Sequence, residues 1–152
     1  MLVESNLIHN ENPNLYQKNR LAMQLIEGSS TPKILLVDDN VLIQFANKQM
    51  LEKLGCKVDV ADNGKEALKL AEKNYYDLIF MDISMPGLNG FEVTRAIRHG
   101  EYRSKEAPIV ALTSYADEYV RKECILSGME NMFQKPISSE GLAEILKTYV
   151  VF

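Results

Sequence analysis

The sequence predicts an α/β protein built on a doubly wound parallel sheet of five strands, with helices on both faces. Short apolar runs alternate with segments of helical periodicity from residue 33 onward. Such alternation is typical of parallel sheets, because each crossover helix returns the chain to the edge where the next strand starts. Right-handed crossovers restrict the topology further, and the expected strand order is the flavodoxin-like 2-1-3-4-5.

The expected strands are short runs, each followed by polar residues. Four of them are strongly apolar or β-branched, as buried strands are, whereas the last is short and weak. The runs are Lys33–Val37, Lys57–Ala61, Asp77–Met81, Ile109–Leu112 and Asn131–Gln134.

Five helices are expected between and after these strands, each with one apolar side. In the first, the predicted buried face consists of Leu42, Phe45, Ala46, Met50 and Leu54. Asn40 is expected to cap the start of this helix, and Gly55 to follow its end. The apolar sides of the later helices carry Ala67, Leu68 and Ala71; Phe91, Val93, Ala96 and Ile97; Ala116, Tyr119, Val120 and Cys124; and Leu142, Ile145, Leu146 and Tyr149.

Residues 1–30 are expected to form an extension ahead of a domain at 31–152. Residues 10–14 are polar, and residues 28–32 have the composition of a linker. Between them we expect a short helix on a flexible tether, although its apolar stripe is ragged. This segment is interpreted as the end of a signalling helix, a dimer contact or a disordered stretch.

The composition is that of an ordinary globular domain, with 152 residues, 46% hydrophobic and 25% charged. A net charge of −4 argues against nucleic-acid binding, which favours a basic face. Cys56 and Cys124 lack metal-ligand spacing and are expected to be reduced, buried thiols. No apolar stretch approaches the roughly 18 residues that span a bilayer, and no secretory signal is recognised. We therefore expect a cytoplasmic protein without direct membrane contact.

Residues that can carry chemistry stand directly after four of the strands. Asp38 and Asp39 follow the first strand, Asp82 the third, Thr113 the fourth and Lys135 the fifth. The order 2-1-3 places the ends of the first and third strands at a topological switch point, where a crevice forms. Clustered carboxylates repel one another, so this edge should bind Mg²⁺, which prefers oxygen ligands. With Lys135 adding a positive charge, one carboxylate could act as a nucleophile toward a phosphoryl group.

Four segments in this order resemble the receiver domain of two-component response regulators. They are Val37-Asp38-Asp39-Asn40, residues 81–90 (MDISMPGLNG), Ala111-Leu112-Thr113-Ser114 and Gln134-Lys135-Pro136-Ile137. The resemblance covers residues 33–149 and is strongest to receivers of hybrid sensor histidine kinases. It implies a signalling module that is switched by phosphorylation, rather than an enzyme with a separate substrate. The implied donor is a histidine kinase or a histidine phosphotransfer protein.

The resemblance also implies a metal site. Asp82 would be the phosphoacceptor and, with Asp39, would ligate Mg²⁺ directly. Asp38 would bind the ion through water, and the backbone carbonyl of Ser84 would complete the protein ligands.

Further implied roles concern the phosphoryl group and the backbone. Thr113 and Lys135 would bind phosphoryl oxygens once Asp82 is modified. The peptide bond between Lys135 and Pro136 would be cis, and Gly90 would serve a tight turn.

One position departs from the family pattern. Receivers usually place an aromatic switch residue three positions before the lysine, where this chain has Met132. Phe133 is adjacent but should point to the opposite face of the sheet, so the resemblance does not extend to a coupling of Thr113 with a rotating aromatic ring. Output would pass to a protein partner through the face of the fourth helix, fifth strand and fifth helix. The alternatives are a vestigial, binding-only receiver and a small-molecule phosphatase.

Overall fold

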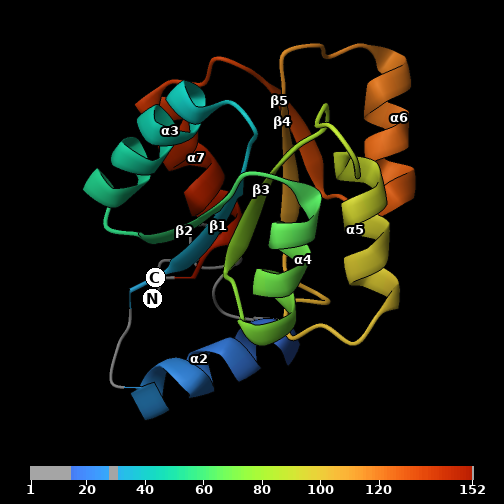
Figure 1. The fold of residues 1–152 in the computed structure, drawn as a ribbon. Helices are drawn as coiled ribbons and strands as arrows, with labels where there is room; N and C mark the ends of the chain where they lie inside the picture. The colour runs from blue at the N-terminus through green and yellow to red at the C-terminus, as the bar shows by residue number, and fades with distance from the viewer. Residues whose placement is uncertain (1–14, 28–30, 152) are drawn as a thin grey trace.

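The computed structural model describes residues 15–27 and 31–151. In that part of the chain, five parallel strands form one sheet in the order β2-β1-β3-β4-β5 (Figure 1). The strands are β1 (Lys33–Val37), β2 (Lys57–Ala61), β3 (Leu78–Asp82), β4 (Ile109–Thr113) and β5 (Asn131–Gln134). The predicted fold class and strand order are confirmed. Residues 1–14, 28–30 and 152, which include the expected polar stretch and the start of the expected linker, lie outside the described residues.

Helices cover both faces of the sheet. They are α2 (Leu15–Glu27), α3 (Val41–Lys53), α4 (Gly64–Lys73), α5 (Gly90–His99), α6 (Glu118–Ser127) and α7 (Ser139–Tyr149). Figure 1 shows α3 and α7 on one face and α4, α5 and α6 on the other. The helix α2 lies across the end of the sheet at which β1 and β3 begin, which we call the base.

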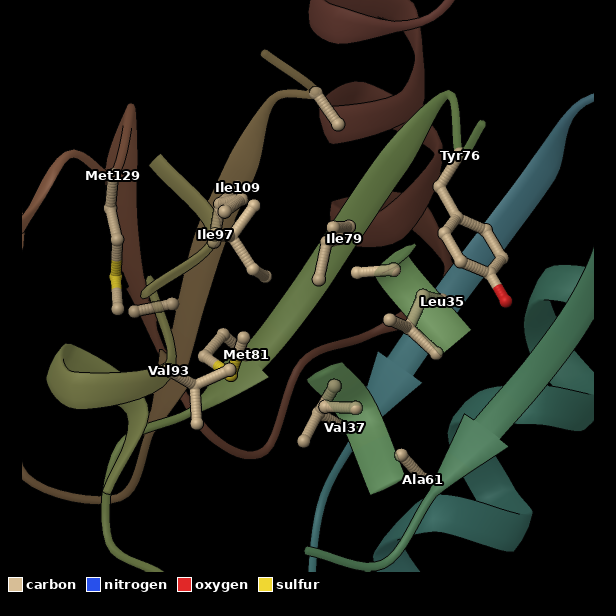
Figure 2. Packing of buried hydrophobic residues seen from close by; sticks show 14 of the residues in the cluster. Leu35, Val37, Ala61, Tyr76, Ile79, Met81, Val93, Ile97, Ile109 and Met129 are labelled. Atoms are coloured by element: carbon tan, nitrogen blue, oxygen red, sulfur yellow. The ribbon is translucent and has the colours of Figure 1, made fainter. Parts of the chain in front are cut away.

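Alternating side chains of the strands fill two hydrophobic cores. Leu35 of β1 belongs to the core beneath α4, α5 and α6, whereas its neighbour Ile34 belongs to the core beneath α3 and α7. Figure 2 shows the first core, where Ile79 of β3 lies near Leu35, and Val93 and Ile97 come from α5. Because both faces are covered, the central strands are continuous apolar runs in the sequence.

Two strands continue to the residues that were expected to carry chemistry. β3 spans Leu78–Asp82, one residue later than the predicted Asp77–Met81, and β4 includes Thr113. The pairing of Asp82 with Leu112 extends the ladder to this point, and the backbone N–H of Lys135 donates to the Thr113 carbonyl at 2.8 Å. The backbone hydrogen bonds of the strands therefore fix the positions of Asp82, Thr113 and Lys135.

The ends of α3 form as predicted. The Asn40 side chain accepts hydrogen bonds from the backbone N–H groups of Leu42 and Ile43, which satisfies two donors of the first turn. Gly55 follows the helix with φ of 95°, a left-handed conformation that only glycine adopts without strain.

The predicted buried face of α3 is wrong. Leu42 and Phe45 are 80% and 59% exposed, and Ala46 is exposed as well. The helix instead buries Asn47 and Leu51, and Met50 and Leu54 pack partly against the core. Because α3 carries apolar residues on most of its circumference, periodicity did not select the side that faces the sheet. We call the exposed residues Val41, Leu42 and Phe45 the α3 apolar face.

The other helices bury most of the residues predicted for them. Ala67 and Ala71 of α4, Val93 and Ile97 of α5, Cys124 of α6, and Leu142, Ile145 and Leu146 of α7 are buried. Tyr119 of α6 is an exception, since it is 69% exposed. Cys56 and Cys124 are both buried and free, as expected. None of the described helices is both long enough and apolar enough to cross a membrane.

Candidate functional site

Three carboxylates gather at the edge of the sheet opposite the base. Asp38 and Asp39 follow β1, and Asp82 ends the neighbouring strand β3. One oxygen of each lies within 4.8 Å of the others. Asp38 and Asp82 are buried, whereas Asp39 is exposed and leaves the cluster open to solvent. The predicted acidic residues therefore lie together at the switch point between β1 and β3.

Lys135 reaches the acidic cluster from β5, the strand at the other edge of the sheet. Its Nζ lies 3.0 Å from Asp38 Oδ2 and 3.4 Å from Asp82 Oδ1, and its side chain is 9% exposed. The residue follows β5 directly, and its peptide bond to Pro136 is cis, as expected. A buried ammonium is costly unless it is paired, and here two buried carboxylates pair with it.

The pKa of Asp82 is raised to about 6. Burial is the main cause and the charge of Asp38 adds to it, while Lys135 opposes both. Three carboxylates around one ammonium leave the edge with excess negative charge, so a further cation would favour the ionised form of Asp82.

Local hydrogen bonds orient Asp38. Its Oδ1 accepts from the backbone N–H of Asn40 at 2.9 Å, and its own N–H donates to the Ala61 carbonyl at 3.1 Å. The side chain of Gln44 donates to the Asp38 carbonyl at 3.1 Å. The carboxylate of Asp38 is thus held in place, whereas Asp39 is exposed to solvent.

Thr113 lies beside the acidic cluster but bonds to its own loop. The residue is 4% exposed at the end of β4. Its Oγ1 accepts from the Tyr115 N–H at 3.1 Å and donates to the Tyr115 carbonyl at 3.3 Å. The Thr113 hydroxyl therefore lies at the end of β4, and its hydrogen bonds are made with the start of the loop that leads to α6.

The loop after β3 passes very close to the backbone at the end of that strand. Gly90 donates its N–H to the Ile83 carbonyl at 2.9 Å, and a Cβ at position 90 would collide with the Asp82 carbonyl oxygen. Glycine is therefore needed at 90 for this close approach. The residue of this loop with a left-handed conformation is Gly87, with φ of 79°. Ser84, whose carbonyl was expected to bind metal, is exposed on the same loop.

Met132 and Phe133 point to opposite faces of β5. Met132 is 4% exposed in the core beneath α4, α5 and α6, and Phe133 packs against the other core. The expectation that Phe133 does not replace the missing aromatic residue at 132 agrees with this placement.

A cavity beside Lys135 escaped the sequence reasoning. It measures about 310 Å³ and lies between α3 and the segment after β5, where it is lined by Ile43, Ala46, Met50, Ile137 and neighbouring residues. The α3 apolar face continues this apolar surface outward. The signal was present in the sequence, because residues 41–46 hold more apolar side chains than one buried stripe can use.

Residues 34–147 match the family described as response regulator receiver domain. The sensor histidine kinase GacS of Pseudomonas protegens is 38% identical over 121 residues, which cover 78% of this chain and 13% of GacS. This chain thus spans a small part of that relative.

Two solved structures have the same fold. The receiver domain of a Pseudomonas aeruginosa sensor histidine kinase, with a magnesium ion coordinated in its active-site cleft, superimposes with a TM-score of 0.72 at 37% identity, covering 79% of this chain and 98% of that one. The receiver domain of Ssk1 from Saccharomyces cerevisiae, in complex with the histidine phosphotransfer protein Ypd1, gives 0.73 at 28% identity, covering 79% and 89%.

Proposed function

This chain belongs to the response regulator receiver domain family of two-component phosphorelays, and from that membership we propose that it accepts a phosphoryl group on Asp82. The observation that carries the proposal is the position of Lys135, whose ammonium contacts both Asp38 and Asp82 beside Asp39. We assign the receiver to residues 31–152 and an extension to residues 1–30.

The acidic cluster fits a Mg²⁺ ion. Asp38, Asp39 and Asp82 present oxygen ligands within 4.8 Å of one another, and their excess negative charge disfavours full ionisation without a cation. These three side chains, with the Ser84 carbonyl, would hold the ion. When bound, it would supply neutralising charge to phosphoryl oxygens.

The chain's own residues would perform the transfer. An oxygen of the Asp82 carboxylate would form the new O–P bond as the N–P bond to the donor histidine breaks, and the departing imidazole would keep its electron pair and take a proton from solvent. Lys135 would bind a phosphoryl oxygen, as would the Thr113 hydroxyl after it leaves Tyr115. The domain would thus act on its own side chain rather than on a separate substrate.

A phosphohistidine-bearing protein is the proposed donor, either a histidine kinase or a histidine phosphotransfer protein. The Ssk1 receiver is solved with such a protein. In this chain the α3 apolar face and the adjoining cavity, which Lys135 borders, offer a mainly apolar surface next to the acidic cluster. Apolar side chains exposed together mark protein contact sites, and these lie where a donor must approach.

The output face would be formed by α6, β5 and α7. Tyr119, Ile125 and Leu126 of α6 are 69%, 55% and 78% exposed. Thr113 leads directly into the loop before α6, so a movement of its hydroxyl would change the start of this face.

Intact mass after incubation with acetyl phosphate and Mg²⁺ tests the proposal. We expect a gain of one phosphoryl group that is lost with hydroxylamine and absent from Asp82→Asn. Glu101→Gln, which changes an exposed carboxylate, should still gain the group. Retained labelling of Asp82→Asn would contradict the assignment. A protein that gains nothing from acetyl phosphate or from a phosphorylated histidine phosphotransfer protein would be a vestigial receiver.

A further inference from the structure

The helix α2 is packed against the base of the sheet, at the end remote from Asp82 (Figure 1). It precedes the receiver in the chain, and the proposed phosphotransfer does not use it. Its contacts are made with residues more than fifty positions later in the sequence. The contacts are therefore tertiary, and local helix propensity does not account for them.

The first contact is made by Tyr16. This side chain is 7% exposed, and its hydroxyl donates to the backbone carbonyl of Tyr76 at 2.6 Å. The centroid of its ring lies 6.0 Å from that of Tyr75, and the two rings are tilted. Aromatic pairs attract each other at this separation. Tyr16 thus brings both apolar area and a satisfied hydroxyl to the base.

The second contact is made by Arg20, four positions later and so on the same side of α2. Its Nε lies 3.3 Å from Asp77 Oδ2, and the residue is 5% exposed. The same carboxylate oxygen accepts the backbone N–H of Lys33 at 2.7 Å. Asp77 therefore joins α2 to the first residue of β1. A buried guanidinium is unfavourable without such a partner, which indicates a specific contact rather than an incidental one.

The receiving surface is rigid. Tyr76 is fully buried, and its hydroxyl donates to Asp59 at 2.6 Å. Its backbone N–H donates to Ser104 Oγ at 3.0 Å, and that hydroxyl donates to the Asn74 carbonyl at 2.6 Å. The residue whose carbonyl Tyr16 binds is thus held by Asp59 and Ser104, neither of which belongs to α2.

A narrow crevice separates α2 from the end of the domain. It is lined by Tyr16, Arg20 and Leu21 on one side and by Tyr149 and Val151 on the other. The segment that enters the receiver and the segment that leaves it therefore lie side by side at the base, away from the α3 apolar face.

From these contacts we infer that the base of the sheet is a docking site for α2 of the same chain, with Tyr16 and Arg20 as its two anchors. The docked helix is an arm that fixes the direction in which the preceding polypeptide enters the receiver. It lies at the base, away from the acidic cluster, from the α3 apolar face and from α6. The expected helix is present as α2 at residues 15–27, and residues 28–30 of the expected tether lie outside the described residues.

Hydrogen exchange of the full chain tests this inference, with protection of the α2 amides as the readout. Wild type should protect them well beyond an unfolded peptide. Arg20→Gln and Tyr16→Phe should each exchange about tenfold faster or more in α2, because each loses a buried hydrogen bond, one of them charge-assisted. Lys18→Ala, an exposed position of the same helix, should leave the rates unchanged. Protection of β3 in every variant shows that the domain remains folded.

Three results would overturn the inference. The first is α2 exchange at the unfolded rate in wild type, and the second is unchanged α2 exchange in both anchor variants. The third is protection that disappears on dilution together with dimers in sedimentation, which would contradict docking within one chain. Labelling of Asp82 by acetyl phosphate is a separate measurement that the anchor variants should not change. Its failure would concern the proposed function and would leave the α2 result intact.

Discussion

Lys135 Nζ lies closer to Asp38 than to Asp82, the proposed acceptor, at 3.0 Å from Asp38 Oδ2 against 3.4 Å from Asp82 Oδ1. The ammonium of Lys135 thus contacts two of the carboxylates that a divalent cation would also bind. A bound Mg²⁺ would therefore compete electrostatically with Lys135 for the same carboxylates, although the proposed phosphotransfer would use both.

Lys135→Met should separate these two effects. Without the ammonium, Mg²⁺ should bind more tightly, because the remaining negative charge is larger. Phosphorylation by acetyl phosphate should nevertheless slow about a hundredfold, since a cation that stabilises the transferring group is lost. Calorimetric titration and intact mass measure the two quantities. Lys147→Met, which alters a side chain that is 77% exposed, should change neither, and weaker Mg²⁺ binding by Lys135→Met would refute the competition.

Asp82→Asn should stabilise the metal-free protein at neutral pH. Burial and Asp38 raise the pKa of Asp82 to about 6, so folding disfavours its ionised form. Between the ordinary aspartate pKa near 4 and this value, the folded protein holds a proton that the unfolded chain has released, and stability falls as pH rises. The penalty is complete above pH 6, and its removal should add about 1–2 kcal/mol, allowing for solvent screening and for the loss of the Lys135 contact.

Thermal unfolding at several pH values, with a chelator present, would measure this effect. The difference between Asp82→Asn and wild type should be near zero at pH 3.5, grow up to pH 6 and then level off. Glu101→Gln serves as a control carboxylate. A variant that is less stable than wild type at pH 7 would show that the Lys135 contact outweighs the burial of charge.

Two glycines in the loop after β3 should differ in their response to alanine. Gly90→Ala places a Cβ against the Asp82 carbonyl, where backbone must move, and should cost about 2–3 kcal/mol. Gly87→Ala meets open space but keeps a φ of 79°, and should cost about 1 kcal/mol. Denaturant unfolding measures both, and an equal cost would show that strain at the two positions has the same origin.

Much of the fold was predictable because buried parallel strands are continuous apolar runs. The site was predictable for a related reason, since its residues follow those runs directly and the topology brings strand ends together. The side of α3 that faces the sheet was not, because Leu42 and Phe45 fit an apolar stripe whereas the buried Asn47 is polar. Position in the fold, rather than hydrophobicity, decides which side is buried.

The docking of α2 and the hydrogen bonds of the Thr113 hydroxyl could not be predicted from the sequence, for a different reason. Arg20 finds Asp77 across 57 positions of sequence, and no local pattern links them. Thr113 is placed by its strand, but its hydroxyl bonds to the backbone of Tyr115, a choice that depends on the conformation of the loop. Sequence pattern reports elements and their order, and contacts between elements require coordinates.

The α3 apolar face provides the sharpest test of how the donor docks. Phe45→Ser removes an aromatic side chain that is 59% exposed, so the free energy of unfolding should change by no more than about 0.5 kcal/mol. Phosphotransfer from a phosphorylated histidine phosphotransfer protein should slow at least about tenfold, since aromatic residues at interfaces contribute strongly to binding. Labelling by acetyl phosphate should not change, because that small donor needs no protein surface. Ile125 on α6 has a similar exposure of 55%. Ile125→Ser is therefore the matched control and should leave transfer from the protein donor intact. Equal slowing by both variants would place the donor elsewhere, whereas slowing by Phe45→Ser alone would connect the exposed side of α3 directly to Asp82.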